Sequence, residues 1–231
     1  MDILYEDNHL LIVHKLCGEI VQGDKTGDEP MVEVLKRYLK EKFSKPGNVF
    51  LGVVHRLDRP VSGLVVFART SKALTRMNEL FRKGEVQKTY WAIVPYRQHI
   101  LTDGTMVSLH HWLTRNEQKN ISRAYEHEVP NSKEARLDYQ MLNHTDRYAL
   151  LQVTLHTGRH HQIRCQLAKV GLPIKGDLKY GAPRSNPDGG IALIARRICF
   201  VHPVSKQPID IVARTPHDSL WEALTNHTST S

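Results

Sequence analysis

The chain has 231 residues, of which 40% are hydrophobic and 24% are charged, and its formal net charge is +8. This composition excludes a disordered or fibrous protein, and the length is enough to bury a proper core. No window approaches the length of a membrane-spanning helix and the N-terminus matches no secretory signal or transit peptide, so we expect a cytoplasmic protein. The positive charge favours a polyanionic partner but does not identify one.

The three cysteines, Cys17, Cys165 and Cys199, lie far apart in the chain and form no CxxC pair. This spacing argues against a disulfide framework and against a cysteine-based zinc site, so we expect reduced and mostly buried thiols. No linker divides the chain, which predicts a single domain over residues 1–231. The polar residues 225–231 are predicted to form a flexible tail.

The first part of the chain predicts one strand and two amphipathic helices, which are bounded by turn residues or caps. They are expected at residues 10–13, from Pro30 to Phe43 with a stop at 45–47, and from a cap at Thr70 or Ser71 to Gly84. The second helix is expected to pack beside a buried strand at 65–67.

Runs of β-branched or aromatic residues bounded by turns predict most of the later strands. These runs cover residues 89–94, 137–142, 148–155 and 209–213, and the turn between the second and third predicts an antiparallel hairpin. The pattern indicates an α+β fold with a mixed, mostly antiparallel β-sheet and flanking helices. Residues 101–130 show no firm periodicity and form either an insertion that reaches a ligand or a surface hairpin.

The stretch HRLDRPVSGL, residues 55–64, places the carboxylate of Asp58 between Arg56 and Arg59. Both arginines favour the ionised form of this acid, and the following apolar run puts it on a loop at a sheet edge. Such a carboxylate suits chemistry on an anionic ligand. The alternative is a structural Asp that accepts hydrogen bonds from its own loop, and both interpretations are open at this point.

Two further segments carry candidate residues. The stretch 157–171, TGRHHQIRCQLAKVG, predicts a helix whose first turns carry Arg159 and Arg164. Arg164 either pairs with Asp58 or is a surface side chain, while the helix N-terminus would suit an anion such as phosphate. Tyr90, on the strand at 89–94, either faces a flat base or fills the core.

We expect no metal and no nucleotide cofactor. Adjacent histidines occur at 110–111 and at 160–161, but neighbouring residues on a helix point in different directions and no third ligand has a recognisable spacing. The glycine-rich motifs of nucleoside triphosphate and dinucleotide sites are missing from the sequence, and so is the serine elbow of hydrolases.

Five segments together resemble the motifs of the RluA-type RNA pseudouridine synthases, in that family's order. They are HRLDRPVSGL (55–64), KTYWAIV (88–94), TGRHHQIRCQL (157–167), GLPIKGDLKYG (171–181) and IALIARRICFVHP (191–203). The resemblance extends from about Leu4 to Thr215. It implies an isomerase that needs no cofactor, acts on uridine in structured tRNA or rRNA, works as a monomer and has a central active-site cleft.

The resemblance also implies roles for particular residues. Asp58 matches the catalytic aspartate, Tyr90 the tyrosine at the target base, and Arg164 the arginine that pairs with the aspartate. The remaining matches imply substrate binding by His55, Arg56, Arg59, Arg159, Gln162 and Leu193, with Arg59 helping to hold the nucleotide out of its stack and Leu193 packing against the base. The rival interpretation is a non-catalytic RNA-binding or RNA-folding protein on the same scaffold.

The sequence departs from the family pattern at three positions. Leu16 stands where the family has proline, Val61 replaces a threonine hydroxyl in the turn after Asp58, and Ile194 stands where many relatives have histidine. Many relatives also carry an N-terminal S4-like RNA-binding module, whereas this chain begins almost directly with the catalytic motifs. We therefore expect RNA recognition by the domain itself, by residues 101–130, or by a partner.

Overall fold

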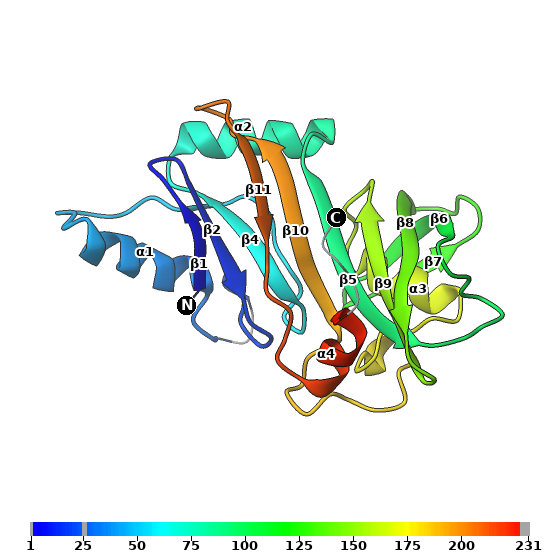
Figure 1. The fold of residues 1–231 in the computed structure, drawn as a ribbon. Helices are drawn as coiled ribbons and strands as arrows, with labels where there is room; N and C mark the ends of the chain where they lie inside the picture. Colours follow the sequence, from blue (N-terminus) through cyan, green and yellow to red (C-terminus); the bar gives the residue numbers. More distant parts are fainter. Residues whose placement is uncertain (1, 25–26, 227–231) are drawn as a thin grey trace. The chain divides into compact units, whose positions relative to one another are not determined.

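The computed structural model describes residues 2–24 and 27–226 (Figure 1). The chain forms two compact units, with residues 1–87 and 195–214 in unit 1 and residues 88–194 and 215–231 in unit 2. The single domain over 1–231 stays a prediction. Of the predicted tail, Thr225 is the last residue of a helix and residues 227–231 lie outside the described part. No helix in the described part is long and apolar enough to cross a membrane.

Unit 1 is an antiparallel arrangement of strands with two helices. Its elements are β1 (Asp2–Glu6), β2 (Leu10–Lys15), α1 (Met31–Lys42), β3 (Gly52–Val53), β4 (Ser62–Ala68), α2 (Ser71–Lys83), β11 (Pro208–Val212) and, from its third residue on, β10 (Leu193–Val201). The strand order is β1-β2-β4-β10, with β3 on β4 and β11 on β10. The pairs β1/β2, β2/β4, β3/β4 and β10/β11 are antiparallel.

Helix α1 buries its apolar stripe against the strands of unit 1. Its side chains at 31, 32, 35 and 39 join those at 11 and 13 of β2 and 65 and 67 of β4 in one core. The predicted helix is confirmed, but it ends one residue earlier than expected. Phe43 is the C-terminal cap rather than a core residue; it is 42% exposed and its ring is covered by the Arg69 guanidinium at 4.6 Å.

The bounds of α2 confirm the prediction from caps. Thr70 Oγ1 accepts a hydrogen bond from Ala73 N at 3.1 Å, and Gly84 ends the helix in the left-handed region. Helix α2 contacts β3 and β4, as expected for the helix beside the strand that follows Asp58. The loop that carries Asp58 therefore lies between two elements that α2 packs against.

Gly63, at the start of β4, occupies a position that admits no side chain. Its φ is +114°, and a Cβ there would lie 2.5 Å from the backbone nitrogen of Ala195. We expect Gly63→Ala to lower the free energy of unfolding by about 2–3 kcal/mol, because both backbone strain and overpacking oppose it. Urea denaturation would measure this, with Gly23→Ala as the control, since a Cβ at Gly23 meets nothing within 4 Å. Equal stability of the two variants would contradict the prediction.

Unit 2 is a five-stranded antiparallel arrangement with the order β5-β9-β8-β6-β7. Its elements are β5 (Gln87–Pro95), β6 (Met106–Asn116), β7 (Ile121–Tyr125), β8 (Lys133–His144), β9 (Tyr148–Leu155), α3 (Gln162–Lys169), the 3₁₀ turn η1 (Leu178–Tyr180) and α4 (Ser219–Thr225). The predicted antiparallel hairpin between β8 and β9 is confirmed. The α+β class is confirmed as well.

Residues 101–130 contain the β-hairpin β6–β7, which agrees with the hairpin alternative for this segment, although the sequence did not predict the bounds of its strands. Leu109, His111 and Leu113 alternate with more exposed residues on β6, and Ser122 is buried on β7. The alternation was hidden because His111 and Ser122 are polar residues at buried positions. Helix α3 contacts both strands and covers this buried face.

Candidate active site

In unit 1, Asp58 lies on the loop between β3 and β4, as the sequence predicted. Its side chain is half-buried. The turn after it is closed by a 3.0 Å hydrogen bond from Val61 N to the carbonyl of Asp58. Since β4 begins at the next residue, the position of this turn is set by a buried strand.

The buried amine of Lys15, at the end of β2, donates hydrogen bonds to the backbone of this turn. Lys15 has no exposed surface, and its Nζ donates to the carbonyls of Leu16 (3.0 Å), Arg59 (3.0 Å) and Val61 (2.7 Å). Burial lowers the pKa of Lys15 to about 8, although the nearby charge of Asp58 is among those that raise it. Lys15 therefore joins the end of β2 to the turn that carries Asp58.

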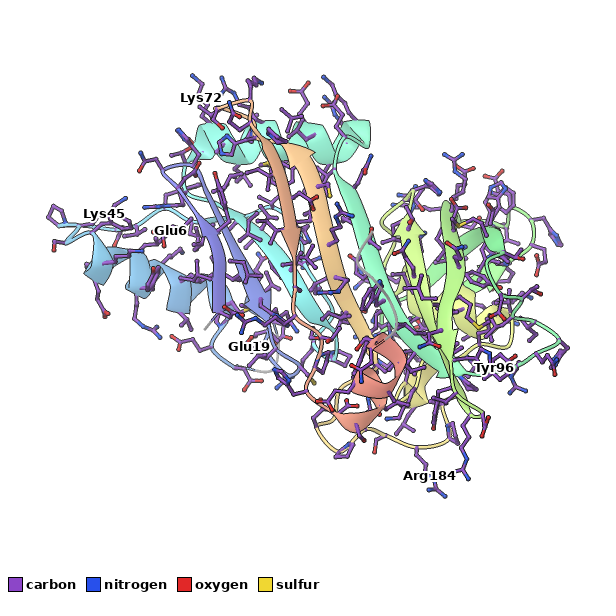
Figure 2. All side chains as sticks on the ribbon, in the orientation of Figure 1. Glu6, Glu19, Lys45, Lys72, Tyr96 and Arg184 are labelled. Carbon is purple, nitrogen blue, oxygen red and sulfur yellow. The ribbon has the colours of Figure 1, made fainter. Side chains whose placement is uncertain are left out.

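A second connection comes from the segment that follows Lys15. Gly18 N donates to the same Arg59 carbonyl at 3.0 Å, and Leu16 N donates to Glu19 Oε2 at 2.6 Å. Glu19, labelled in Figure 2, lies just beyond the end of β2. Leu16 is 61% exposed although its amide and carbonyl are both engaged. The proline missing at this position is thus replaced by hydrogen bonds that fix the backbone.

The basic residues around Asp58 are placed differently from one another. Arg56 is exposed. Arg59 forms an ion pair with Asp28, in which Nη2 lies 2.6 Å from Oδ2. His55 Nε2 accepts a hydrogen bond from Val66 N at 3.2 Å, and its ring lies 5.2 Å from that of Phe81. The contacts of His55 tie the loop to β4 and α2.

In unit 2, Tyr90 lies on β5 opposite Val153 of β9 and is only 7% exposed. Leu193, the first residue of β10, is 4% exposed. Its neighbour Ile194 is fully buried, so a histidine at this position would need a polar partner inside the protein. Val61 is likewise buried, at 3%, which explains why an apolar side chain is accommodated in that turn.

Arg164, on α3, forms a buried ion pair with Asp177. Its Nε donates to Oδ2 at 2.7 Å and its Nη2 donates to Oδ1 at 2.8 Å, and the two side chains are 5% and 1% exposed. The ring of Tyr180 lies 5.1 Å from the centre of the guanidinium. The surface position considered for Arg164 is therefore wrong, while its pairing with Asp58 stays a prediction.

Arg159 and Gln162 shape the segment before α3. Gln162 Oε1 accepts from Thr157 Oγ1 at 2.8 Å and from Arg159 N at 2.9 Å, while its Nε2 donates to the carbonyl of Arg136. The guanidinium of Arg159 is exposed and donates through Nε to the Glu134 carbonyl. Gln162 thus holds the loop that presents Arg159.

The histidine pair 160–161 lies before the helix rather than on it, which corrects the expected geometry. Helix α3 begins only at Gln162, and His161 adopts a left-handed conformation with φ 53°. The two rings are stacked with centroids 3.7 Å apart instead of pointing in different directions. The loop replaces the expected first helical turn because His161 leaves the α-helical region.

A chain of hydrogen bonds links His161 to β7. Ser122 N donates to the Tyr180 hydroxyl oxygen at 2.8 Å, so this hydroxyl can donate its own proton to His161 Nδ1, 2.9 Å away. Burial raises the pKa of Tyr180 to about 12. Burial, together with the positive charge of Arg164, lowers the pKa of His161 to about 2. His161 is therefore a neutral hydrogen-bond acceptor.

We expect this histidine to make the protein less stable in acid. Between about pH 6.5 and pH 2 the unfolded chain binds a proton at His161 that the folded protein does not, so the free energy of unfolding falls as the pH falls, by up to about 1.4 kcal/mol per pH unit. Asparagine adopts the left-handed backbone of residue 161 readily and has an oxygen acceptor, but it binds no proton in this pH range. The variant His161→Asn should therefore flatten the pH dependence of the free energy of unfolding, as measured by urea denaturation. The exposed His127→Asn is the control; a slope unchanged by His161→Asn would reject the assignment.

Three residues with buried contacts, one in unit 1 and two in unit 2, were not identified from the sequence. Lys15 lies beside Leu16, one of the positions that depart from the family pattern, and a single Lys, Asp or Tyr has no spacing that reveals a buried contact. Asp177 and Tyr180 belong to the segment GLPIKGDLKYG, whose glycines signalled a turn. Only the fold shows that this turn brings a carboxylate to Arg164.

Comparison with known proteins identifies similar sequences. Residues 9–169 match the family model for RNA pseudouridylate synthase. The chain is 33% identical to ribosomal large subunit pseudouridine synthase D of Xylella fastidiosa, covering 94% of this chain and 67% of that protein. It is 34% identical to ribosomal large subunit pseudouridine synthase C of Vibrio cholerae, covering 91% of this chain and 64% of the relative. The chain thus spans about two thirds of the length of these relatives.

Two further comparisons concern length and fold. The tRNA pseudouridine synthase C of Haemophilus influenzae is 29% identical, covering 98% of this chain and 97% of that protein. Among solved structures, human RNA pseudouridylate synthase domain containing 4 superposes with a TM-score of 0.76 at 24% identity, covering 94% of this chain and 89% of that one. This structural likeness supports the fold.

Proposed function

Since this chain belongs to the RluA-type RNA pseudouridylate synthase family, we propose that it converts specific uridines in structured tRNA or rRNA to pseudouridine. The observation that carries the proposal is that the stretch matching the family, residues 9–169, contains Asp58, Tyr90 and Arg164. The relatives named above act on large-subunit ribosomal RNA or on tRNA, so both remain candidate substrates.

The reaction is an isomerisation that balances without a cofactor. The bond between N1 of uracil and C1′ of ribose breaks, the base rotates, and a bond forms between C5 and C1′. C5 then loses its proton and N1 gains one. We assign Asp58 as the nucleophile that attacks the sugar or the base, because a rigidly held carboxylate suits covalent catalysis. The bond that Asp58 forms breaks again before the product leaves, which regenerates the carboxylate. The hydrogen bonds of Lys15 to its turn support the required rigidity.

Tyr90 and Arg164 are assigned to the base and to the catalytic carboxylate. Tyr90 would stack on the uracil and take part in the late proton transfer from C5. Arg164 would orient Asp58 through charge-assisted hydrogen bonds. The burial of both side chains in unit 2 supports fixed positions for them.

The remaining assignments concern how the RNA is held. A uridine inside a helix cannot be reached, so it must leave its stack at a cost of a few kcal/mol. Arg59 would hold the target nucleotide out of its stack, Leu193 would pack against the base, and His55, Arg56, Arg159 and Gln162 would complete the substrate site. The exposed guanidinium groups of Arg56 and Arg159 are suited to phosphate contacts.

The setting of the activity is also part of the proposal. We assign a cytoplasmic monomer that needs no other protein and recognises RNA through its own surface, including the β6–β7 hairpin. Cell fractionation tests the cytoplasmic location, and size-exclusion chromatography of the purified chain tests whether it is a monomer. A filter-binding assay with Lys119→Ala, at the tip of the hairpin, tests whether the β6–β7 hairpin contributes to RNA recognition.

Carbodiimide-based mapping of pseudouridine in total RNA tests the function. RNA is compared from cells with the gene, without it, and without it but complemented by the Asp58→Asn variant. Sites that disappear on deletion and return only with the unaltered protein would establish the activity and identify the RNA. An unchanged map, together with tight RNA binding by the purified protein, would favour the rival non-catalytic RNA-binding protein.

A further inference from the structure

We propose that Asp177 is a positioning residue for the reaction, which holds Arg164 in the one orientation that serves the catalytic carboxylate. The inference rests on the proposed function and adds a residue to which the sequence analysis assigned no role. It stands on three observations in unit 2: the two-point contact with Arg164, the fixed backbone of Asp177, and the aromatic face of Tyr180 beside the same guanidinium.

The contact between Asp177 and Arg164 fixes both the position and the rotation of the guanidinium. Asp177 takes the edge formed by Nε and Nη2, at 2.7 and 2.8 Å. A guanidinium has five N–H groups in a planar fork, so this pairing leaves the Nη1 edge directed away from Asp177. A lysine at 164 would supply charge without such a direction.

The backbone of Asp177 is itself fixed. Its carbonyl accepts hydrogen bonds from Tyr180 N and from Ala182 N, both at 3.0 Å, and its amide donates to Ile174 O at 3.0 Å. The preceding Gly176 has φ +89°, and a Cβ there would lie 2.7 Å from the side chain of Asn186. The carboxylate therefore projects from a segment that has little freedom to shift.

Tyr180 is the second residue of this segment that contacts the Arg164 guanidinium. The Tyr180 ring lies 5.1 Å from the guanidinium carbon, within the range of a cation–π contact. Its hydroxyl is tied to Ser122 on β7 and to His161. Asp177 thus controls one edge of the guanidinium, and Tyr180 restricts its tilt.

Stability alone is a weak explanation for this ion pair. Removing two charges from water costs several kcal/mol per ion, and well-packed apolar residues often replace a buried pair without loss of stability. The pair fixes the direction of the Arg164 guanidinium, whose other edge must face the reacting carboxylate. This direction matters because small displacements of catalytic groups cost about 10²-fold in rate.

The test compares Asp177→Asn and Asp177→Glu with the control Asp210→Asn. Asp210 forms a similar two-point pair with Arg197, at 2.8 and 2.5 Å, but both side chains are nearly half exposed. With the RNA identified by mapping, we expect Asp177→Asn to lower kcat by about 10²-fold while KM stays within about threefold. Asp177→Glu keeps the charge and should recover part of kcat, while Asp210→Asn should match the unaltered protein.

Nitrogen NMR supplies a readout that needs no activity. The Nε–H of Arg164, identified by its loss in Arg164→Lys, should exchange slowly with water in the unaltered protein and quickly in Asp177→Asn. If Asp177→Asn does not fold, the same measurements are made on Asp177→Glu, whose longer side chain shifts the guanidinium. For this variant we then expect a lower kcat with a protected Nε–H.

Several results would overturn the inference. One is an unchanged kcat in a variant whose Arg164 Nε–H has lost its protection, since Asp177 would then matter only to structure. Another is a rise in KM that accounts for the whole effect. If the unaltered protein forms no pseudouridine in any RNA, the proposed function itself fails, and the NMR readout still shows whether Asp177 holds Arg164.

Discussion

Replacing Asp58 by asparagine is expected to abolish pseudouridine formation while leaving the fold and RNA affinity nearly unchanged. The substitution removes the nucleophilic charge but keeps the volume of a half-buried side chain, and it leaves in place the backbone hydrogen bond from Val61 N to the carbonyl of residue 58 that closes the turn. Loss of a nucleophile commonly lowers turnover by more than about 10³-fold. A single-turnover assay on the mapped RNA, with filter binding in parallel, measures both effects.

The control for this prediction is Asp146→Asn. Asp146 is an exposed carboxylate in the turn between β8 and β9. Its replacement removes the same charge from unit 2 at a position without a proposed role. Turnover by Asp58→Asn at more than a tenth of the rate of this control would contradict the nucleophile assignment, and a joint loss of RNA binding would show that Asp58 contributes to affinity instead.

Replacing Lys15 by methionine is expected to have the largest effect on stability. The variant leaves three buried or partly buried carbonyls, those of residues 16, 59 and 61, without the amine that now donates to them. The Arg59 carbonyl keeps the hydrogen bond from Gly18 N, so two acceptors, the carbonyls of residues 16 and 61, are left unsatisfied. Each costs about 1–3 kcal/mol, and we expect a loss of roughly 2–4 kcal/mol after local relaxation. Urea denaturation followed by circular dichroism measures the change.

This variant also tests whether the Lys15 amine keeps the Asp58 turn in place. If the folded fraction is isolated at low temperature, its kcat should fall because the turn is released from β2. Lys40→Met, on the exposed face of α1, controls for the loss of a positive charge. A Lys15→Met protein as stable and as active as Lys40→Met would show that the three hydrogen bonds are dispensable.

Both predictions concern one feature of unit 1, a carboxylate on a turn whose backbone is held by a buried amine. The apolar strands β2 and β4 place Lys15 and the turn side by side, with Lys15 paired to Gly63 in the sheet register. A side chain at Gly63 would disturb the same region. The sheet thus supplies a rigid base for the loop that carries Asp58.

The local sequence predicted the helices of unit 1 closely because their ends carry strong signals. Thr70 caps α2, Gly84 terminates it, and the apolar spacing after Pro30 gives α1. These are short-range effects, in which the backbone and a nearby side chain satisfy one another. The prediction of the 157–171 helix was less accurate because His161 takes a left-handed conformation that no local rule requires.

For the candidate site, the motifs singled out the residues proposed to react but not those that hold them. Asp58 stood out because arginines flank it in the sequence, and Arg164 and Tyr90 through their family motifs. Lys15 lies 43 residues before Asp58, and Asp177 lies 13 residues after Arg164 with a helix end and a turn between them. Neither distance corresponds to a helical or strand period, so no pattern could connect the pairs.

The amino-acid sequence by itself determined the fold class, the caps and apolar periods of its main elements, and the motifs that place the chain in its family, because each depends on neighbouring residues. The tertiary structure decided which groups are buried together: an amine with three carbonyls at the Asp58 turn, and a carboxylate with the Arg164 guanidinium. The physical reason is that burial of a charge depends on what distant segments place around it, since a group removed from water must find its partners within the fold.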